Sequence, residues 1–404
     1  MQKNICIYED SGYSQLYPLT LTRPVFDLRC GIISLREKVI HYFREQQYYL
    51  SVRSGLEELC REQSPNCIVN QFPDGDCYFI NGRFIFEDDP PEFQENTILT
   101  LGNQFIGAFL QALEIKKLRK DKNGLLNFSS FSELHKHEVK GRLINYPWDL
   151  VHYNGLEISK DFNLLNKSKH VEGDVYHNAT LLAKENIYIG PGAKVYPGVV
   201  INAENGPVYV DKNVTIMSNA VLEGPIAIGC GSIIKIGAKI YEGVSIGKHC
   251  KVGGEVEESI IHGFSNKQHE GFLGHSYLGE WVNLGADTNN SDLKNNYGSV
   301  KVHINGELID SGSMFVGIFM GDHSKSGINT MFNTGSVVGV MCNVFGAGFT
   351  PKNIPSFTWG GIVRSDRYEF SKAIETAKRV MKRRNQELTG SQEKILQTIY
   401  DSKS

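Results

Sequence analysis

The chain has 404 residues, of which 41% are hydrophobic and 22% charged, and its formal net charge at pH 7 is −3. This length allows two ordinary domains, each with a core of its own. No apolar run approaches the ~20 residues that a membrane helix needs, and no basic excess of the kind that nucleic-acid binding requires is present. We therefore expect a globular protein without a membrane span and without a nucleic-acid partner.

The start of the chain, MQKNICIYEDSG, has no basic segment followed by an apolar one. It does not look like a secretion signal, so we expect a cytoplasmic protein. The 8 cysteines are scattered without any C-x-x-C pair. This pattern favours reduced, mostly buried thiols over disulfides or a zinc site.

Residues 1–142 show strand and helix patterns in alternation. We expect strands at NICIYED, YYLSVR, NCIVN and CYFINGRFIF, and helices at GIISLREKVIHYFREQ and QFIGAFLQALEIKKLRK. Such alternation predicts an α/β domain with a mostly parallel sheet. Residues 143–169, which begin LINYPWDLVHYNG, are expected to form a linker to the next domain.

Residues 170–358 repeat an aliphatic residue at every sixth position. A six-residue period fits no helix face, and it is the signature of a parallel β-helix whose coils stack at ~4.8 Å with the aliphatic residues inside. The clearest run is Val210, Ile216, Leu222, Ile228, Ile234, Ile240, Ile246 and Val252. The register resumes at Phe272, Leu278 and Leu284, and more weakly at Val316, Asp322, Ile328, Thr334 and Val340.

Residues 359–404 change to a helical period. Phe370, Ile374, Ala377 and Met381 share one face, and the other faces are rich in Lys and Arg. This predicts an amphipathic helix that caps the open end of the coil, where unpaired strand edges would otherwise be exposed. Its basic residues are alternatively candidates for holding the phosphates of an acyl carrier.

The repeat fills with His, Asn and Asp between residues 269 and 298. Because residues 272–288 keep the register, His269 and Asn283 must project outward or lie at corners, and NNSDLKNNYGSVKVHING is expected to form a loop. A histidine there is a candidate general base. His275, on the next face, is the alternative base. Together with His262, these two histidines could instead ligate a metal ion, although their spacing places them on successive faces.

This block resembles the acetyltransferase site of the bifunctional N-acetylglucosamine-1-phosphate uridyltransferase/glucosamine-1-phosphate N-acetyltransferase enzymes. The similarity runs without a gap from His269 through Thr288. It implies a left-handed β-helix, acetyl-CoA as co-substrate, glucosamine 1-phosphate as acceptor, and His269 as the base that takes a proton from the sugar amine. The implied substrate and acyl-CoA contacts are Asn283, Ala286, Asn296 and Tyr297.

Two positions depart from the family pattern. Phe272 replaces a tyrosine, and Glu257 replaces a lysine, which reverses the charge. Lys294 or Lys301 would then have to supply the positive charge for the sugar phosphate.

The N-terminal SGYSQLYPLTLTRP resembles the phosphate loop of the family's nucleotidyltransferase domain, G-x-G-T-R followed by L-x-P-L-T. Its first part departs from that loop, because Tyr13 replaces a glycine where a backbone N–H must approach a phosphate closely. Asn81 stands in place of the family's Gly-Asp pair for Mg²⁺, and an amide is a poor ligand for that cation. The candidate nucleotide contacts are Gly12 and Asn81, together with Arg23 and Arg29, which could supply the missing positive charge.

The resemblance covers nearly the full chain and indicates a variant bacterial group with a shortened first domain. The leading hypothesis is acetyl transfer to glucosamine 1-phosphate in UDP-N-acetylglucosamine biosynthesis, with uridylyl transfer from UTP, assisted by Mg²⁺, if the first domain is active. The alternatives are a non-catalytic regulatory protein that binds sugar nucleotides or acyl-CoA, and a β-helix metal hydratase. We expect a homotrimer in each case, because the flat walls of such a coil expose long faces.

Overall fold

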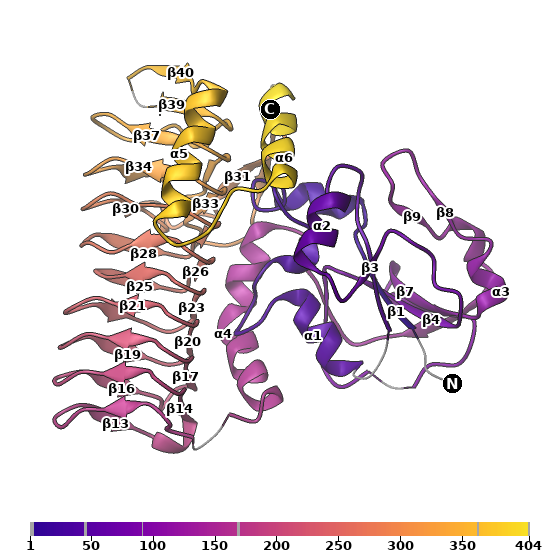
Figure 1. The fold of residues 1–404 in the computed structure, drawn as a ribbon, viewed down its shortest axis with the longest axis horizontal. Coiled ribbons are helices and arrows are strands. Elements are labelled where there is room, and N and C mark those ends of the chain that lie inside the picture. Colours follow the sequence, from indigo (N-terminus) through magenta and orange to yellow (C-terminus); the bar gives the residue numbers. More distant parts are fainter. Residues whose placement is uncertain (1–3, 44–46, 91, 168–169, 362, 403–404) are drawn as a thin grey trace.

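In a computed structural model, the protein is described over residues 4–43, 47–90, 92–167, 170–361 and 363–402. An α/β domain lies beside a long coil, and α4 (Pro147–Leu164) stands between them (Figure 1). Within the described ranges, no helix combines the length and the apolar character needed to cross a membrane.

The N-terminal domain is built on a seven-stranded sheet in the order β10-β6-β7-β4-β1-β2-β3. Four of its strand pairs are parallel, so the prediction of a mostly parallel sheet is confirmed. The strands are β1 (Asn4–Tyr8), β2 (Gln47–Ser51), β3 (Ile68–Val69), β4 (Cys77–Asn81), β6 (Thr97–Leu101), β7 (Gln104–Leu110) and β10 (His135–Glu138). Around them lie α1 (Leu35–Tyr42), α2 (Glu57–Gln63), α3 (Ala112–Ile115), β5 (Phe84–Phe86), β8 (Arg119–Lys120), β9 (Leu126–Asn127) and β11 (Gly141–Leu143).

The helix expected at residues 104–120 is wrong in its first half, which is strand β7. This strand pairs antiparallel with both β4 and β6. Gly107 permits the close approach to β4, since a Cβ at this position would lie 2.1 Å from the carbonyl oxygen of Phe79. Burial between two strands therefore overrides the helical propensity of the segment.

Residues 170–361 form a parallel β-helix with three walls, so the prediction of a parallel β-helix is confirmed. The first wall contains β12 (Asp174–Val175), β15 (Lys194–Val195), β18 (Thr215–Ile216), β21 (Ile233–Ile234), β24 (Lys251–Val252) and β27 (Asn266–Lys267), continued by β34 (Lys325–Ser326), β37 (Asn343–Phe345), β39 (Thr358–Gly361) and β40 (Ser365–Arg367). The second wall contains β13 (Thr180–Leu182), β16 (Val200–Asn202), β19 (Val221–Glu223), β22 (Lys239–Ile240), β25 (Glu255–Glu257) and β28 (Phe272–Gly274), followed by β30 (Asn289–Asn290) and β35 (Met331–Phe332). The third wall, which faces α4, contains β14 (Ile187–Ile189), β17 (Val208–Val210), β20 (Ile226–Ile228), β23 (Val244–Ile246), β26 (Ile260–Ile261), β29 (Tyr277–Leu278), β33 (Ile318–Met320), β36 (Ser336–Val338) and β38 (Asn353–Ile354).

The hexad residues from Val210 to Val252 all point into the coil and are at most 1% exposed. The predicted register is wrong in two later places. Leu273, rather than Phe272, is buried in the coil, and Ile328 is 72% exposed. After the interruption the inward series is instead Met320, Phe332, Val338 and Val344, two residues out of phase with the predicted one.

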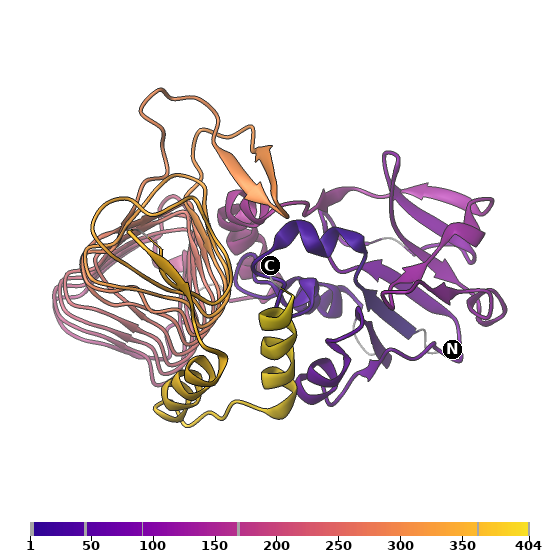
Figure 2. The same ribbon diagram turned by 90° about the horizontal axis from the view of Figure 1, so that it is seen from above.

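The segment expected to be a loop after residue 288 is more ordered than predicted. The chain leaves the coil after β30, forms the hairpin β31 (Lys301–Ile304) and β32 (Glu307–Asp310), and returns at residue 317. We call residues 291–316 the excursion. Its hairpin reaches the N-terminal domain (Figure 2), where Val302 and Ile304 are buried in a cluster with Leu16 and Trp148.

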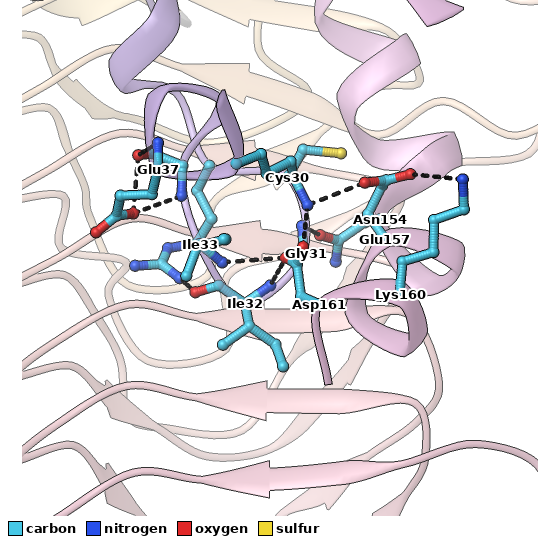
Figure 3. A network of polar contacts seen from close by, with 12 residues as sticks. Cys30, Gly31, Ile32, Ile33, Glu37, Asn154, Glu157, Lys160 and Asp161 are labelled. Carbon is cyan, nitrogen blue, oxygen red and sulfur yellow. Dashed lines mark hydrogen bonds and ion pairs between the residues drawn. The ribbon is translucent and has the colours of Figure 1, made fainter. Parts of the chain in front are cut away.

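The expected linker contains α4, which is packed against the third wall. Polar side chains of α4 bind the segment that precedes α1 (Figure 3). Asp161 Oδ2 accepts a hydrogen bond from the N–H of Ile32 at 2.8 Å, and Asn154 Oδ1 accepts one from the N–H of Gly31 at 2.7 Å. Asn154 Nδ2 also donates to the carbonyl of Gly243 in the coil, at 2.8 Å. One buried amide thus joins the α/β domain to the coil.

The C-terminal helices do not lie across the end of the coil. Helix α5 (Phe370–Lys382) runs along its side, and α6 (Gly390–Asp401) lies between the coil and α2 (Figures 1 and 2). The amphipathic pattern of α5 is confirmed, since Ala373, Ile374, Ala377 and Met381 are buried. The apolar face therefore packs on the flank of the coil and does not cap it.

Candidate functional site

His269 lies at the first corner of the coil, between the first and second walls, and is exposed to solvent. The carbonyl of His269 accepts a hydrogen bond from Lys267 Nζ at 2.8 Å. Lys267 is 2% exposed, because it occupies an inward position among aliphatic residues. Its burial lowers the pKa of the ammonium group to about 8. A buried cation thus fixes the backbone of this corner, while the imidazole stays accessible.

Two of the predicted contacts lie on the next coil beside His269. The N–H of Asp287, which follows Ala286, donates to the carbonyl of Glu270 at 3.1 Å. Asn283, in the first wall, accepts from Asn266 Nδ2 at 3.3 Å. The structure therefore brings His269, Asn283 and Ala286 together on the outer surface near one corner.

The other predicted contacts lie elsewhere, because Asn296, Tyr297 and Lys301 belong to the excursion. The excursion leaves the coil at the second corner, between the second and third walls. Tyr297 is 68% exposed, and Asn296 Oδ1 accepts from the N–H of Gly298 at 3.1 Å. Lys301 pairs in register with Asp310 across the hairpin. Within one chain these residues do not surround His269.

His275 lies at this second corner and is held in place. Its Nδ1 atom is 2.9 Å from Asp292 Oδ2, and its ring stacks on Phe315 with 5.0 Å between centroids. Asp292 and Phe315 both belong to the excursion, which is thereby fixed to the coil. Sequence analysis missed Asp292, since it lies within a polar stretch with no periodicity, and only the fold places it over His275.

Glu257 completes a group of possible metal ligands with His275 and Asp292. The ligand atoms of the three residues all lie within 4.8 Å of one another. Burial, followed by the charge of Asp292, raises the pKa of Glu257, and burial together with Glu242 raises that of Glu258 to about 7. One nitrogen and two carboxylate oxygens form a donor set that suits Zn²⁺ or a similar divalent ion.

The three histidines considered as joint metal ligands occupy three different corners. His262 lies at the third corner, between the third and first walls, where its Nδ1 atom is 3.3 Å from Glu280 Oε1. His269 and His275 lie at the first and second corners. Within one chain they do not converge on a shared ion.

A cavity of about 560 Å³ opens near the ends of β1 and β4 in the N-terminal domain. Its lining includes Asp10, Asn81, Thr100, Phe128 and Lys136. Open α/β sheets bind ligands in such crevices at the carboxyl ends of their strands. This cavity is the candidate nucleotide site.

The side chain of Arg83 fills the loop after β1. Arg83 donates to Asp10 Oδ1 through Nε at 2.7 Å and to Oδ2 through Nη2 at 2.5 Å, and Asn81 Nδ2 donates to Oδ2 at 2.8 Å. A Cβ on Gly12 would lie 2.3 Å from the Arg83 guanidinium. Burial would raise the pKa of Asp10, but the bonds and charge of Arg83 outweigh it, so the pKa is lowered.

Gly12 and Asn81, two predicted nucleotide contacts, thus lie together beside Asp10. Since Arg83 and Asn81 occupy both oxygens of Asp10, these residues as arranged do not fit Mg²⁺, which requires free oxygen ligands in octahedral geometry.

Arg23 and Arg29, the other predicted nucleotide contacts, lie away from this cavity and against the coil. Arg23 Nη2 is 2.5 Å from Asp322 Oδ2 and 3.4 Å from Glu280 Oε2. The backbone N–H of Arg29 donates to the hydroxyl of Tyr277 at 2.9 Å. Their expected role at the nucleotide phosphates is not supported by these positions, because both residues join the two domains.

Comparison with known proteins agrees with this two-part organisation. Residues 5–170 match the model of the sugar nucleotidyl transferase family. A bifunctional GlmU protein from Methanocaldococcus jannaschii is 24% identical over 373 residues, a match that covers 80% of this chain and 83% of the relative. The chain therefore resembles the bifunctional GlmU proteins over most of its length.

Other matches to this chain are shorter. The bifunctional GlmU protein of Rippkaea orientalis is 27% identical over 43% of this chain and 34% of its own length. A bifunctional sugar-1-phosphate nucleotidylyltransferase/acetyltransferase of Sulfurisphaera tokodaii is 35% identical over 22% of this chain and 23% of its own length. The chain thus spans about a third or less of the length of these two relatives.

Among solved structures, the UDP-N-acetylglucosamine acyltransferase of Francisella novicida matches with 15% identity and a TM-score of 0.31. The match covers 57% of this chain and 89% of that one.

Proposed function

We propose that the coil transfers the acetyl group of acetyl-CoA to the amine of glucosamine 1-phosphate, as a step of sugar-nucleotide biosynthesis. The observation that carries this proposal is the meeting of His269, Asn283 and Ala286 at one exposed corner. These residues come from two successive coils, and they are the part of the predicted site that a single chain can assemble.

In the proposed reaction His269 acts as the general base. An amino sugar is largely an ammonium ion at neutral pH, so a proton must leave before the nitrogen can attack. The freed amine attacks the thioester carbonyl, a C–N bond forms, and the intermediate carries an oxyanion. The C–S bond then breaks, and the coenzyme A thiolate leaves and takes up a proton. Asn283 and the backbone N–H groups of this corner are the candidate donors to the oxyanion.

His275 is the alternative base. An aspartate on Nδ1 orients a histidine in many acid–base pairs, and Asp292 has this position. The ring of His275, however, is enclosed by Phe315 and its side chain is 16% exposed. We assign His275 the role of holding the excursion, and His269 the role of base.

We also propose that the active form is a homotrimer. The first corner carries exposed apolar side chains as well as His269, among them Ile236 (62% exposed) and Ile328 (72% exposed). A neighbouring coil would cover these side chains and complete the acyl site. The excursion of a neighbour could then bring Asn296, Tyr297 or Lys301 to His269.

For the N-terminal domain we propose binding of a uridine nucleotide or UDP-sugar in the cavity beside Asp10. The family match over residues 5–170 supports this role. Uridylyl transfer from UTP to N-acetylglucosamine 1-phosphate would require Asp10 to exchange Arg83 for a metal ion. A second candidate function for this domain is therefore nucleotide binding without turnover, which the Asp10–Arg83 pair favours.

The proposed acetyl transfer is tested by following thiol release from acetyl-CoA by the purified protein. The expected result is release that depends on glucosamine 1-phosphate, together with an acetylated product of the corresponding mass. Release at the same rate without the acceptor, or none with the coil intact by circular dichroism, contradicts the proposal.

A further inference from the structure

Glu257, His275 and Asp292 meet at the second corner of the coil from three separate segments. Glu257 ends β25, His275 follows β28, and Asp292 lies at the start of the excursion. One possible ligand atom of each residue lies within 4.8 Å of those of the other two. We call these three residues the corner triad. Their ligand atoms are close enough to bind a single ion.

Neighbouring residues hold the corner triad in position. The His275 ring stacks on Phe315 with 5.0 Å between centroids, and Asp292 is only 8% exposed. Gly274 admits the carboxylate of Asp292, since a Cβ at this position would lie 2.5 Å from Asp292 Oδ2. The same Cβ would lie 2.5 Å from the ring of Phe272, so an apolar ring borders the triad. In such a partly desolvated place a carboxylate attracts a cation more strongly than it does in water.

The corner triad carries more negative than positive charge. Two of its members are carboxylates whose oxygens lie within 4.8 Å of each other, and like charges at this distance repel. Among the described residues, no lysine or arginine forms an ion pair with Glu257, with Asp292 or with the adjacent Glu258. His275 offers at most one positive charge to this group. A divalent cation bound between the two carboxylates would remove their repulsion.

We propose that the corner triad binds a divalent transition-metal ion such as Zn²⁺, which fastens the excursion to the coil. One imidazole nitrogen and two carboxylate oxygens are typical Zn²⁺ donors, and three protein ligands leave a fourth position for water. The nitrogen donor favours this class of ion over Mg²⁺ and Ca²⁺, which take oxygen ligands. The inference does not depend on the proposed acetyl transfer.

The proposed ion accounts for two side chains that the acetyl-transfer site does not use. Glu257 and Phe272 are the positions at which the chain departs from the pattern it resembles, and both border Gly274. Glu257 pairs in register with Gly274, and the ring of Phe272 lies over it. An acidic residue at position 257 is unsuited to a phosphate contact, but it is a suitable ligand for a metal ion. An ion bound there also lies at the base of the excursion, whose hairpin contacts the N-terminal domain.

The test is calorimetric titration of the full-length protein, purified without a histidine tag and stripped with EDTA, with Zn²⁺ and separately with Mg²⁺. The variants are Glu257→Gln and Asp292→Asn. Glu255→Gln is the matched control, because it removes the same charge from the same strand outside the corner triad. We expect the wild type to bind Zn²⁺ in preference to Mg²⁺ and each triad substitution to weaken Zn²⁺ binding at least about tenfold. Glu255→Gln should leave the affinity unchanged.

Two further measurements distinguish a built site from weak binding elsewhere on the surface. Bound Co²⁺ should show the visible absorption of a low-coordinate ion in the wild type, and this absorption should be lost in Glu257→Gln. Since an ion bound only by the folded chain stabilises it, Zn²⁺ should raise the urea midpoint of the wild type but not that of Asp292→Asn. Circular dichroism of each variant shows that the coil is retained.

Failure of the stripped wild type to bind Zn²⁺ overturns the inference, and the triad is then a hydrogen-bonded contact alone. Equal Zn²⁺ binding by the wild type and both triad variants overturns it as well. Mg²⁺ binding as tight as that of Zn²⁺ overturns the class of ion. None of these results bears on the proposed acetyl transfer, because thiol release is measured separately and no step of it uses the ion.

Discussion

His275 Nδ1 lies 2.9 Å from Asp292 Oδ2, which joins a corner of the coil to the excursion. The hairpin of the same excursion packs on the N-terminal domain, where Asn305 Nδ2 donates to the carbonyl of Ser14 at 2.9 Å. This hydrogen bond therefore holds in place the segment through which the coil contacts the first domain. His269, in contrast, has an accessible ring and lies next to Asn283 and Ala286. The two histidines should respond differently to substitution.

Asp292→Ala should loosen the excursion. Loss of the carboxylate leaves His275 without its partner, and we expect the free energy of unfolding to fall by about 1–3 kcal/mol. Urea denaturation of the purified protein measures this change. The kcat of acetyl transfer at saturating substrate should remain within a few-fold of the wild-type value, because His269 is unchanged. A loss of activity as large as that of His269→Ala would instead assign the base to the His275–Asp292 pair.

Arg23→Ala should weaken the contact between the domains. The substitution leaves Asp322 and Glu280 without their guanidinium, and loss of one partner of a buried pair costs about 3–5 kcal/mol. The midpoint of chemical denaturation measures the effect. Arg364→Ala is the matched control, since its pair with Asp366 is exposed and should change stability by less than about 0.5 kcal/mol. Equal effects of the two substitutions would contradict the role given to Arg23.

Lys267 predicts a pH dependence of stability. Burial lowers the pKa of its ammonium group from 10.5 to about 8 in the folded chain. Between these values the unfolded chain binds more protons, so the contribution of Lys267 to stability is unfavourable below pH 8 and improves as the pH rises toward 10.5. The shift corresponds to about 3 kcal/mol.

This effect is measured by comparing the wild type with Lys267→Met at several pH values. The difference in unfolding free energy between the two proteins should change in favour of the wild type from pH 8 to pH 10. A difference that stays constant over this range would show that the ammonium group is not buried as described.

Binding in the N-terminal cavity should not depend on Mg²⁺. Arg83 and Asn81 already occupy the oxygens of Asp10, so no carboxylate there is ready to bind the cation. We expect UDP-N-acetylglucosamine to bind with the same affinity in Mg²⁺ and in EDTA, as measured by calorimetry. Binding that requires Mg²⁺ would mean that Arg83 moves aside, and would make uridylyl transfer the better account of this domain.

The coil could be predicted from sequence because its inward residues repeat without interruption from Val210 to Val252. The prediction of inward residues is wrong where the sequence no longer keeps the six-residue period. Ile328 is apolar and falls at a predicted inward place, yet it lies on the surface at 72% exposure. An exposed isoleucine and a buried one look alike in sequence when the polar residues around them no longer keep the period.

The candidate site was only partly predictable for a different reason. His269, Asn283 and Ala286 lie on two successive coils with no insertion between them, so their spacing in sequence fixes their positions relative to one another in the coil. The roles of Asp292 and Arg83 could not be assigned from sequence. Their pairing with His275 and Asp10 depends on how the excursion and the loop after β1 fold back. The role of Arg23 could not be assigned from sequence either, because a guanidinium can form an ion pair between domains as readily as it can bind a phosphate.

The most direct test of the account compares His269→Ala with His275→Ala in the thiol-release assay, on proteins shown to keep the wild-type oligomeric state. General-base catalysis contributes typically 10²–10⁴-fold, so His269→Ala should lower kcat by a factor in that range. His275→Ala should lower the unfolding midpoint and leave kcat within a few-fold. The opposite pattern, with activity lost in His275→Ala and kept in His269→Ala, would contradict the assignment of His269 as the base.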